Sequence, residues 1–266
     1  MEKIGLIAGN GNFPYFFYEA ANKKAEIFSI GLFETVNEKL KKVKNYTQIN
    51  IGELGKLTKY LLQNDIKKII MLGKVEKSLV FQELELDNIL QVVVGQLPDR
   101  KDETLIFGII AFLKSKGIEI LPQNYLMDEL LIEEKVYTKA RPSEDDKRTI
   151  EIGKEAAKML GQLDIGQTIV VNTQAVVALE GVEGTDETIK RSGIYAPKDS
   201  IIVKVSRPQQ DMRVDVPAIG LKTIEEAIKI NAKGLILEAD KVIFLDKEAV
   251  IKKADENGLF LAGERI

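Results

Sequence analysis

The chain has 266 residues, a formal net charge of -3, and neither cysteine nor histidine. This composition excludes disulfides, zinc–thiolate sites, Ser-His-Asp triads and histidine-ligated metal centres. Acid–base chemistry must therefore use Asp, Glu, Lys, Tyr or water, and a bound metal would need oxygen ligands, which favours Mg²⁺ or Mn²⁺.

Charge and hydropathy also indicate the class of partner. A slightly acidic chain lacks the basic surface that is typical of nucleic-acid binding, so we expect no nucleic-acid partner. No apolar run reaches the roughly 18 residues that a membrane-spanning helix needs. The first residues are typical of a strand rather than of a signal peptide, which predicts a cytoplasmic protein.

Short apolar runs alternate with helical patterns through the first half of the chain. Strands are predicted at residues 4–8, 25–30, 68–72 and 118–121. Helices are predicted at residues 13–24, 36–43, 54–64 and 102–116, with Asp102 as a cap of the last one. This alternation favours an α/β fold with a parallel, doubly wound, Rossmann-like sheet. Residues 77–97 are apolar and acidic and give no clear period.

A domain boundary is predicted near residues 134–142, because Pro142 interrupts the pattern and Ser143 can cap the next helix. We expect a Rossmann-like nucleotide-binding domain of residues 1–138 and a mixed α/β catalytic domain of residues 139–266. In the second domain, strands are predicted at residues 168–172, 175–179, 200–205 and 259–262, with a hairpin of residues 234–238 and 241–245. Helices are predicted at residues 143–160, 187–192, 223–231 (capped by Thr223) and 247–257.

A glycine-rich loop follows the first strand. Gly9, Asn10 and Gly11 precede a helix that has Pro14 in its first turn. Glycines let the backbone approach a phosphate, and a helix N-terminus favours negative charge, so the loop predicts a nucleotide contact. Pro14 replaces the third glycine of the dinucleotide fingerprint, which disfavours NAD. An ordinary strand–helix turn is the alternative reading.

Residues 180–186 form the first of two charged loops. Glu180, Glu183 and Asp186 lie close together in sequence among glycines, and such a loop can gather oxygens around a hard cation. Thr185 or Asp186 could instead cap the helix that follows.

Positive and negative side chains are mixed along the second loop, from Lys204 to Asp215. In an extended chain Arg213 and Asp215 face the same side, and an arginine there would keep the carboxylate ionised as a ligand or base. A solvated loop is the alternative. Charge spacing alone makes residues 210–220 one of two plausible acidic loops, and the exclusion of histidine and cysteine chemistry strengthens the case that they form a catalytic segment.

Several stretches together resemble the LpxI-type UDP-2,3-diacylglucosamine pyrophosphatases, a bacterial family of lipid A biosynthesis. The most specific are Glu183-Gly184-Thr185-Asp186 and the Arg-x-Asp-x-Pro-x-Ile-Gly pattern of residues 213–220. Further matching stretches run in order nearly end to end: residues 5–9 with Gly11 and Pro14, 102–105, 141–143, 163–167 and 258–260. Members more often have Lys-Pro-Gly at residues 207–209, where this chain has Arg-Pro-Gln.

The resemblance implies metal-dependent hydrolysis of UDP-2,3-diacylglucosamine to UMP and 2,3-diacylglucosamine 1-phosphate (lipid X), at a cleft between the two domains. The family's critical aspartate aligns with Asp215. We hypothesise that Glu183, Asp186 and Asp215 hold Mg²⁺ or Mn²⁺ and that Arg213 acts with Asp215 in catalysis. The predicted substrate-binding residues are Gly9, Asn10, Gly11, Pro14, Thr185, Lys204 and Asp211.

The acyl chains of such a substrate would need an apolar trough, for which Tyr15 and Tyr18 are candidates. Peripheral contact with the inner membrane and assembly into a homo-oligomer are both compatible with the sequence. Two alternatives stay open at this point. One is a non-catalytic protein that senses UDP-sugars or nucleotides, and the other is a nicotinamide-dependent oxidoreductase.

Overall fold

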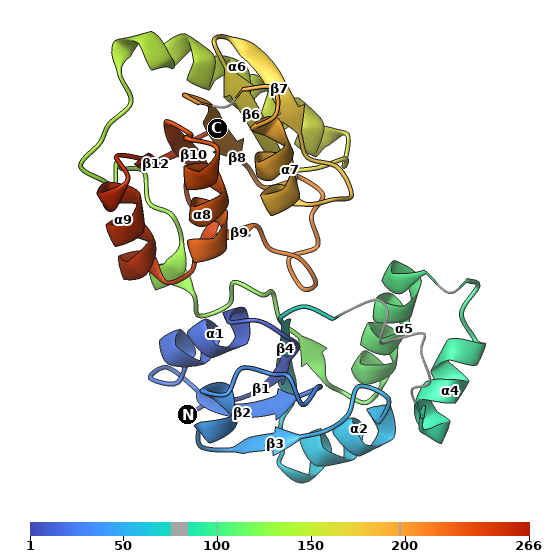
Figure 1. The fold of residues 1–266 in the computed structure, drawn as a ribbon. Helices are drawn as coiled ribbons and strands as arrows, with labels where there is room; N and C mark the ends of the chain where they lie inside the picture. The colour runs from blue at the N-terminus through green and yellow to red at the C-terminus, as the bar shows by residue number, and fades with distance from the viewer. Residues whose placement is uncertain (76–84, 100, 197) are drawn as a thin grey trace. The chain divides into compact units, whose positions relative to one another are not determined.

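A computed structural model describes residues 1–75, 85–99, 101–196 and 198–266 of the chain. Its contacts divide the chain into two compact units. The N-terminal unit comprises Met1–Met127 and Met212–Val214, and the C-terminal unit comprises Asp128–Asp211 and Asp215–Ile266. The main division thus falls at residues 127 and 128, whereas the sequence predicted residues 138 and 139. Both units combine a sheet with helices, which confirms the α/β class (Figure 1).

Five parallel strands form the sheet of the N-terminal unit, in the order β3-β2-β1-β4-β5. The strands are β1 (Lys3–Ala8), β2 (Glu26–Gly31), β3 (Tyr46–Gln48), β4 (Lys68–Leu72) and β5 (Glu119–Ile120). The helices are α1 (Phe13–Ala21), α2 (Leu54–Gln63), α4 (Asn88–Gly95) and α5 (Asp102–Ser115), with the short 3₁₀ helix η1 (Leu40–Lys42). This confirms the predicted Rossmann-like parallel sheet.

The strand order reverses beside β1, because the chain runs to β2 and β3 on one side and to β4 and β5 on the other. Right-handed crossovers in the two directions place α1 and α2 on opposite faces, as Figure 1 shows. In open sheets of this kind, ligands bind outside the carboxyl ends of the strands at the reversal point. The carboxyl ends of β1 and β4 lie at this reversal point.

Two sequence predictions for the N-terminal unit are wrong in detail, and one strand was missed. Residues 36–43 form only η1, because the Asn37 side chain accepts a hydrogen bond from the backbone N–H of Lys39 (2.8 Å) and stabilises a turn. Asp102 is the first residue of α5, and Lys101 is the cap.

Strand β3 was not predicted, since three residues carry too little periodicity. Of the unphased residues 77–97, Asn88–Gly95 form α4, and residues 77–84 lie outside the described part.

The C-terminal unit has a mixed sheet in the order β12-β10-β8-β6-β7, which confirms its predicted class. The parallel strands are β8 (Ile201–Lys204), β10 (Gly234–Glu238) and β12 (Phe260–Glu264), and the antiparallel strands are β6 (Thr168–Asn172) and β7 (Ala175–Leu179). The helices are α6 (Lys147–Gln162), α7 (Thr185–Ser192), α8 (Leu221–Lys229) and α9 (Lys247–Glu256), with the 3₁₀ helices η2 (Asp128–Leu130) and η3 (Glu144–Asp146). Ser143 caps η3 through a reciprocal capping box with Asp146, whereas the sequence predicted it as the cap of the longer helix, which begins at Lys147.

The hairpin predicted for residues 234–238 and 241–245 is wrong. β10 is paired along both edges, with β8 and with β12, so no edge remains for the strand that follows it. That strand, β11 (Ile243–Phe244), instead pairs in parallel with β9 (Ala218–Ile219) in a separate two-stranded sheet. The turn itself exists, with Asp240 at a φ of 62°, but it joins two different sheets.

The start of α8 also differs from its prediction. Gly220 precedes the helix, and Thr223 lies inside the first turn, where its hydroxyl donates to Asp186 rather than capping the helix (3.0 Å). Within the described ranges, no helix has both the length and the apolar character needed to cross a bilayer.

Candidate functional site

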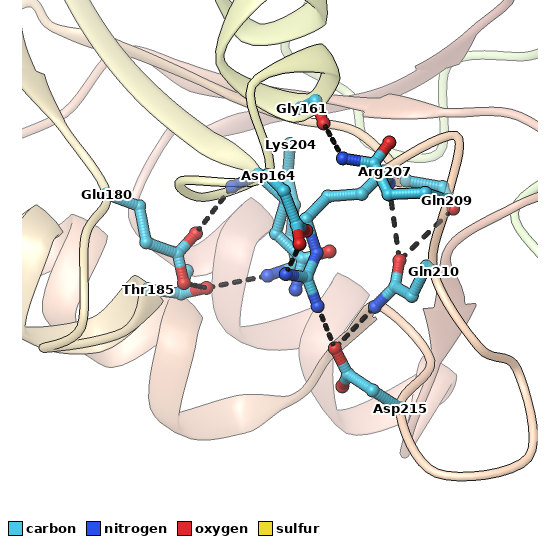
Figure 2. A network of polar contacts seen from close by, with 11 residues as sticks. Gly161, Asp164, Glu180, Thr185, Lys204, Arg207, Gln209, Gln210 and Asp215 are labelled. Atoms are coloured by element: carbon cyan, nitrogen blue, oxygen red, sulfur yellow. Dashed lines mark hydrogen bonds and ion pairs between the residues drawn. The ribbon is translucent and has the colours of Figure 1, made fainter. Parts of the chain in front are cut away.

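Asp215 lies in a network of polar side chains in the C-terminal unit (Figure 2). Its Oδ2 atom accepts hydrogen bonds from Arg207 Nη2 at 2.8 Å and from Gln210 Nε2 at 2.5 Å. The backbone N–H of Asp215 donates to the carbonyl of Asp211 at 3.0 Å, which closes a turn. About half of the Asp215 side chain is exposed (47%), so the carboxylate is held on one side and open on the other.

Arg207 bridges two carboxylates. Its Nη1 atom donates to Asp164 at 2.7 Å while Nη2 donates to Asp215. Its Nε atom is buried and has no hydrogen-bond partner among the described residues. The backbone of Arg207 is held in turn by Gln210, whose Oε1 accepts from the Arg207 N–H at 3.2 Å. Gln210 therefore contacts both ends of the ion pair and keeps the loop closed around Asp215.

Lys204 is the last residue of β8 and is almost completely buried, with 3% of its surface exposed. Its ammonium donates to the hydroxyl of Thr185 at 2.6 Å, and Thr185 donates to Glu180 at 3.2 Å. Burial lowers the pKa of Lys204, and the nearby charges of Glu180, Asp215 and Asp186 oppose this shift while Arg207 adds to it. Lys204 and Arg207 thus place two cations close to Asp215.

Thr185 opens helix α7, and Gly184 precedes it in a conformation (φ 81°, ψ 171°) that is open essentially only to glycine. This explains the glycine of the Glu183-Gly184-Thr185-Asp186 stretch by backbone geometry. The turn brings Thr185 beside Lys204, so the predicted substrate-binding residues Thr185 and Lys204 do lie together.

The three predicted metal ligands each contact a different cation. The Glu183 carboxylate accepts a hydrogen bond from Arg191 Nη2 at 2.7 Å. Its pKa is lowered, first by a hydrogen bond from the backbone N–H of Glu183 itself and second by the hydrogen bond from Arg191. Asp186 pairs with Lys222 at 3.1 Å, and Asp215 pairs with Arg207. In the part of the chain that the structure describes, no group of three acidic side chains is close enough to hold a metal ion. The donors do not fit a shared metal in this arrangement, and a requirement for Mg²⁺ or Mn²⁺ stays a prediction.

Arg207 was not among the predicted site residues, whereas Arg213 was. Arg213 belongs to Met212–Val214, which groups by its contacts with the N-terminal unit. Met212 is held there by the backbone N–H of Gln123, which donates to its carbonyl at 2.6 Å. Arg207 belongs to the charged stretch of residues 204–215 from which the site was predicted. Its contact with Asp215 forms only because the loop folds back, which the sequence pattern does not indicate. The roles predicted for Arg213 and Asp211 stay predictions.

The glycine loop of the N-terminal unit is bonded to the end of β4. The backbone N–H of Gly9 donates to Leu72 and that of Asn10 donates to Lys74, both at 2.8 Å. A Cβ atom on Gly9 would lie 2.6 Å from the carbonyl oxygen of Lys74, so close packing of two strand ends requires this glycine. Pro14 is buried in the first turn of α1. These contacts explain Gly9 and Pro14 structurally, and the nucleotide contact predicted for this loop stays a prediction.

A cavity of about 550 Å³ lies within the N-terminal unit, at the carboxyl ends of β1 and β4. Its walls are mostly apolar and include Leu57 of α2, Val94 of α4 and Ile109 of α5. Val214 also lines it, from the segment that joins this unit late in the sequence. Tyr15 and Tyr18, the sequence candidates for an apolar trough, are not among the described residues that line it.

Comparison with known proteins assigns both halves of the chain. Residues 3–130 match the LpxI N-terminal domain and residues 133–262 match the LpxI C-terminal domain. The chain is also 28% identical, over 275 aligned residues, to the UDP-2,3-diacylglucosamine pyrophosphatase LpxI of Caulobacter vibrioides. That alignment covers 99% of this chain and 98% of the relative. Because the two domain matches together span nearly every residue, the protein belongs to the LpxI family.

Proposed function

We propose that the protein hydrolyses the pyrophosphate bond of UDP-2,3-diacylglucosamine, releasing UMP and 2,3-diacylglucosamine 1-phosphate in lipid A synthesis. The observation that carries this proposal is the end-to-end similarity to the Caulobacter vibrioides pyrophosphatase, with both LpxI domains present. Two features of the structure also support it. The substrate has an anionic pyrophosphate, which suits the charged network of the C-terminal unit, and apolar acyl chains, which suit the cavity of the N-terminal unit.

The charged network of the C-terminal unit suits the anionic part. Lys204 and Arg207 supply two positive charges to a site that also holds the carboxylates of Asp215, Asp164 and Glu180. In phosphoryl transfer most of the catalytic effect comes from positioning the groups and from stabilising charge on the phosphoryl oxygens. A buried lysine is especially effective, since its field is weakly screened by water.

The cavity of the N-terminal unit suits the apolar part. Its 550 Å³ volume and its leucine, isoleucine and valine walls match a ligand with hydrocarbon chains. Each methylene group that leaves water for such a cavity contributes about 0.8 kcal/mol. A nucleotide alone would leave this surface unused.

In the proposed reaction, a water molecule attacks one phosphorus atom and transfers a proton to Asp215. The bond between that phosphorus and the bridging oxygen breaks, and the electron pair stays with the departing phosphate. Lys204 and Arg207 neutralise charge on the phosphate oxygens as it develops. One phosphate group leaves with uridine and the other with the acylated sugar.

The substitution Asp215→Asn tests the assignment of Asp215. It keeps the shape of the side chain but removes the base, so UMP release should fall by at least about 100-fold, or roughly 2.7 kcal/mol of transition-state stabilisation. UMP would be quantified from purified UDP-2,3-diacylglucosamine, in parallel with Mg²⁺ and with EDTA, which also tests the predicted metal requirement.

Asp145→Asn is the matched control, since Asp145 is exposed on η3 and should retain wild-type activity. Activity of Asp215→Asn within about tenfold of the wild type, or 1.4 kcal/mol, would contradict the role of Asp215. Binding of the substrate by wild-type protein without any UMP release would instead favour a sensor of UDP-sugars.

A further inference from the structure

One edge of the Arg207 guanidinium is only half used. A guanidinium presents Nε and one Nη atom along the same edge, where they can bind two oxygens of one anion. In Arg207 the Nη2 atom of this edge donates to a single oxygen of Asp215, and the buried Nε atom has no partner among the described residues. The Asp215 carboxylate therefore holds the edge by one hydrogen bond instead of two.

An unused buried donor is costly in a folded protein. Native structures contain few buried N–H groups without a partner, because such a group loses its hydrogen bonds to water and gains none in return. The Asp215 oxygen that contacts Arg207 is also shared with Gln210. A ligand that offers two oxygens to Nε and Nη2 would satisfy both donors, and it would leave Asp215 hydrogen-bonded to Gln210.

We propose that Arg207 is a phosphate receptor that releases Asp215 when substrate binds. A phosphate group of the pyrophosphate takes the Nε–Nη2 edge in a bidentate contact and displaces the Asp215 carboxylate from it. Asp164 stays on Nη1 and holds the guanidinium in place during the exchange. Without substrate, Arg207 holds the Oδ2 atom of Asp215 in an ion pair, and this oxygen leaves the guanidinium only when a phosphate has arrived.

This inference rests on the proposed function for its substrate, but it concerns a contact that catalysis alone does not require. A purely structural ion pair would hold residues 207 and 215 together in all states and would bind no anion. The two possibilities differ in whether Asp215 competes with phosphate for the same edge of Arg207.

Binding of inorganic pyrophosphate in EDTA-containing buffer, measured by calorimetry, separates these possibilities without any turnover. Arg207→Gln should weaken binding at least about tenfold, or 1.4 kcal/mol, because both donors of the edge are lost. Arg207→Lys should fall between Arg207→Gln and the wild type, since it keeps the charge and loses the bidentate edge. Thermal unfolding of each variant verifies that the protein is folded.

The decisive pair is Asp215→Asn and Asp164→Asn. Each removes one negative charge that is bonded to the same guanidinium, so their long-range effects on an anion are alike. Only Asp215 contacts an atom of the Nε–Nη2 pair, namely Nη2, whereas Asp164 contacts Nη1. We expect Asp215→Asn to tighten pyrophosphate binding by about tenfold and Asp164→Asn to tighten it by no more than about threefold.

Three results would overturn the inference: no measurable pyrophosphate binding by the wild type, equal binding by folded Arg207→Gln, or equal tightening by the two aspartate variants. None of these results depends on UMP release. Failure of the wild type to hydrolyse UDP-2,3-diacylglucosamine would instead overturn the proposed activity and leave the binding results for Arg207 standing.

Discussion

Lys204 shows how one residue can set the electrostatics of a site. It is buried at the end of β8 and donates to a hydroxyl, Thr185, instead of to a carboxylate. Its pKa is lowered from the usual value of 10.5, chiefly by burial. A lysine in this position is costly for folding, and a bound phosphate would compensate its charge directly.

This lowered pKa gives a defined pH dependence of stability. Between the folded pKa of Lys204 and 10.5, the unfolded chain binds more protons than the folded one, so the free energy of unfolding rises with pH in that window. Lys204→Met lacks this contribution. The unfolding free energy of the wild type should therefore rise relative to that of Lys204→Met toward alkaline pH, by at most about 1.4 kcal/mol per pH unit.

Urea unfolding followed by circular dichroism, at several values between about pH 7 and pH 10, measures this difference. At neutral pH the methionine variant should be at least as stable as the wild type, because it buries no charge. Parallel stability curves for the two proteins across this range would contradict a lowered pKa of Lys204.

At the scale of elements, helix α4 separates a cavity face from a solvent face. Leu90 and Val94, four residues apart, line the cavity, whereas Val92 is 59% exposed. This spacing is that of one helix face. The helix therefore offers two valines, two positions apart, in opposite environments.

Val94→Phe should fill part of the cavity and lower kcat/KM for UDP-2,3-diacylglucosamine by at least about tenfold, or 1.4 kcal/mol, because the ring takes up volume in which the acyl chains would be buried. Val92→Phe adds the same side chain on the exposed face and should stay within about twofold of the wild type. The comparison requires initial rates for both variants and calorimetry with inorganic pyrophosphate, whose binding neither should change. Equal activity of the two variants would exclude the cavity as the acyl site.

At the scale of the whole molecule, the two proposed binding regions lie in different units. The residues assigned to phosphate (Asp164, Lys204, Arg207 and Asp215) all belong to the C-terminal unit, and the cavity belongs to the N-terminal unit. The C-terminal unit has its own buried cores, which include Phe244 and Leu235 in one cluster and Phe260 and Val203 in another. Of residues 128–266, only Met212–Val214 group by their contacts with the N-terminal unit.

A fragment of residues 128–266 should therefore fold cooperatively and bind inorganic pyrophosphate with an affinity within about tenfold of the full chain. It should release no UMP from UDP-2,3-diacylglucosamine, since it lacks the cavity. Circular dichroism, calorimetry and the UMP assay test these three points. A fragment as active as the full chain would show that the N-terminal unit is dispensable. The predicted cytoplasmic location, membrane contact and homo-oligomer are separate questions that stay predictions.

The sequence by itself determined the chemistry that this protein has to work with and most of its elements. Missing histidine and cysteine exclude whole classes of mechanism regardless of fold. Strands such as β4 and β6 lie where the sequence predicted them, because a buried strand is a short apolar run bounded by turn residues. The Asp215 segment was found from charge pattern and family resemblance, both of which are properties of contiguous residues.

Only the tertiary structure decided which groups meet. Asp215 pairs with Arg207, whereas Glu183 pairs with Arg191 and Asp186 pairs with Lys222. The N–H of Gly9 donates to Leu72 and so joins the ends of two strands. The tertiary structure also separated β10 from β11, since both edges of β10 were taken by distant strands. These ion pairs, hydrogen bonds and strand pairings form between residues far apart in the chain, which compete for the same partners. Local periodicity describes only neighbouring residues and therefore does not predict which partner is chosen.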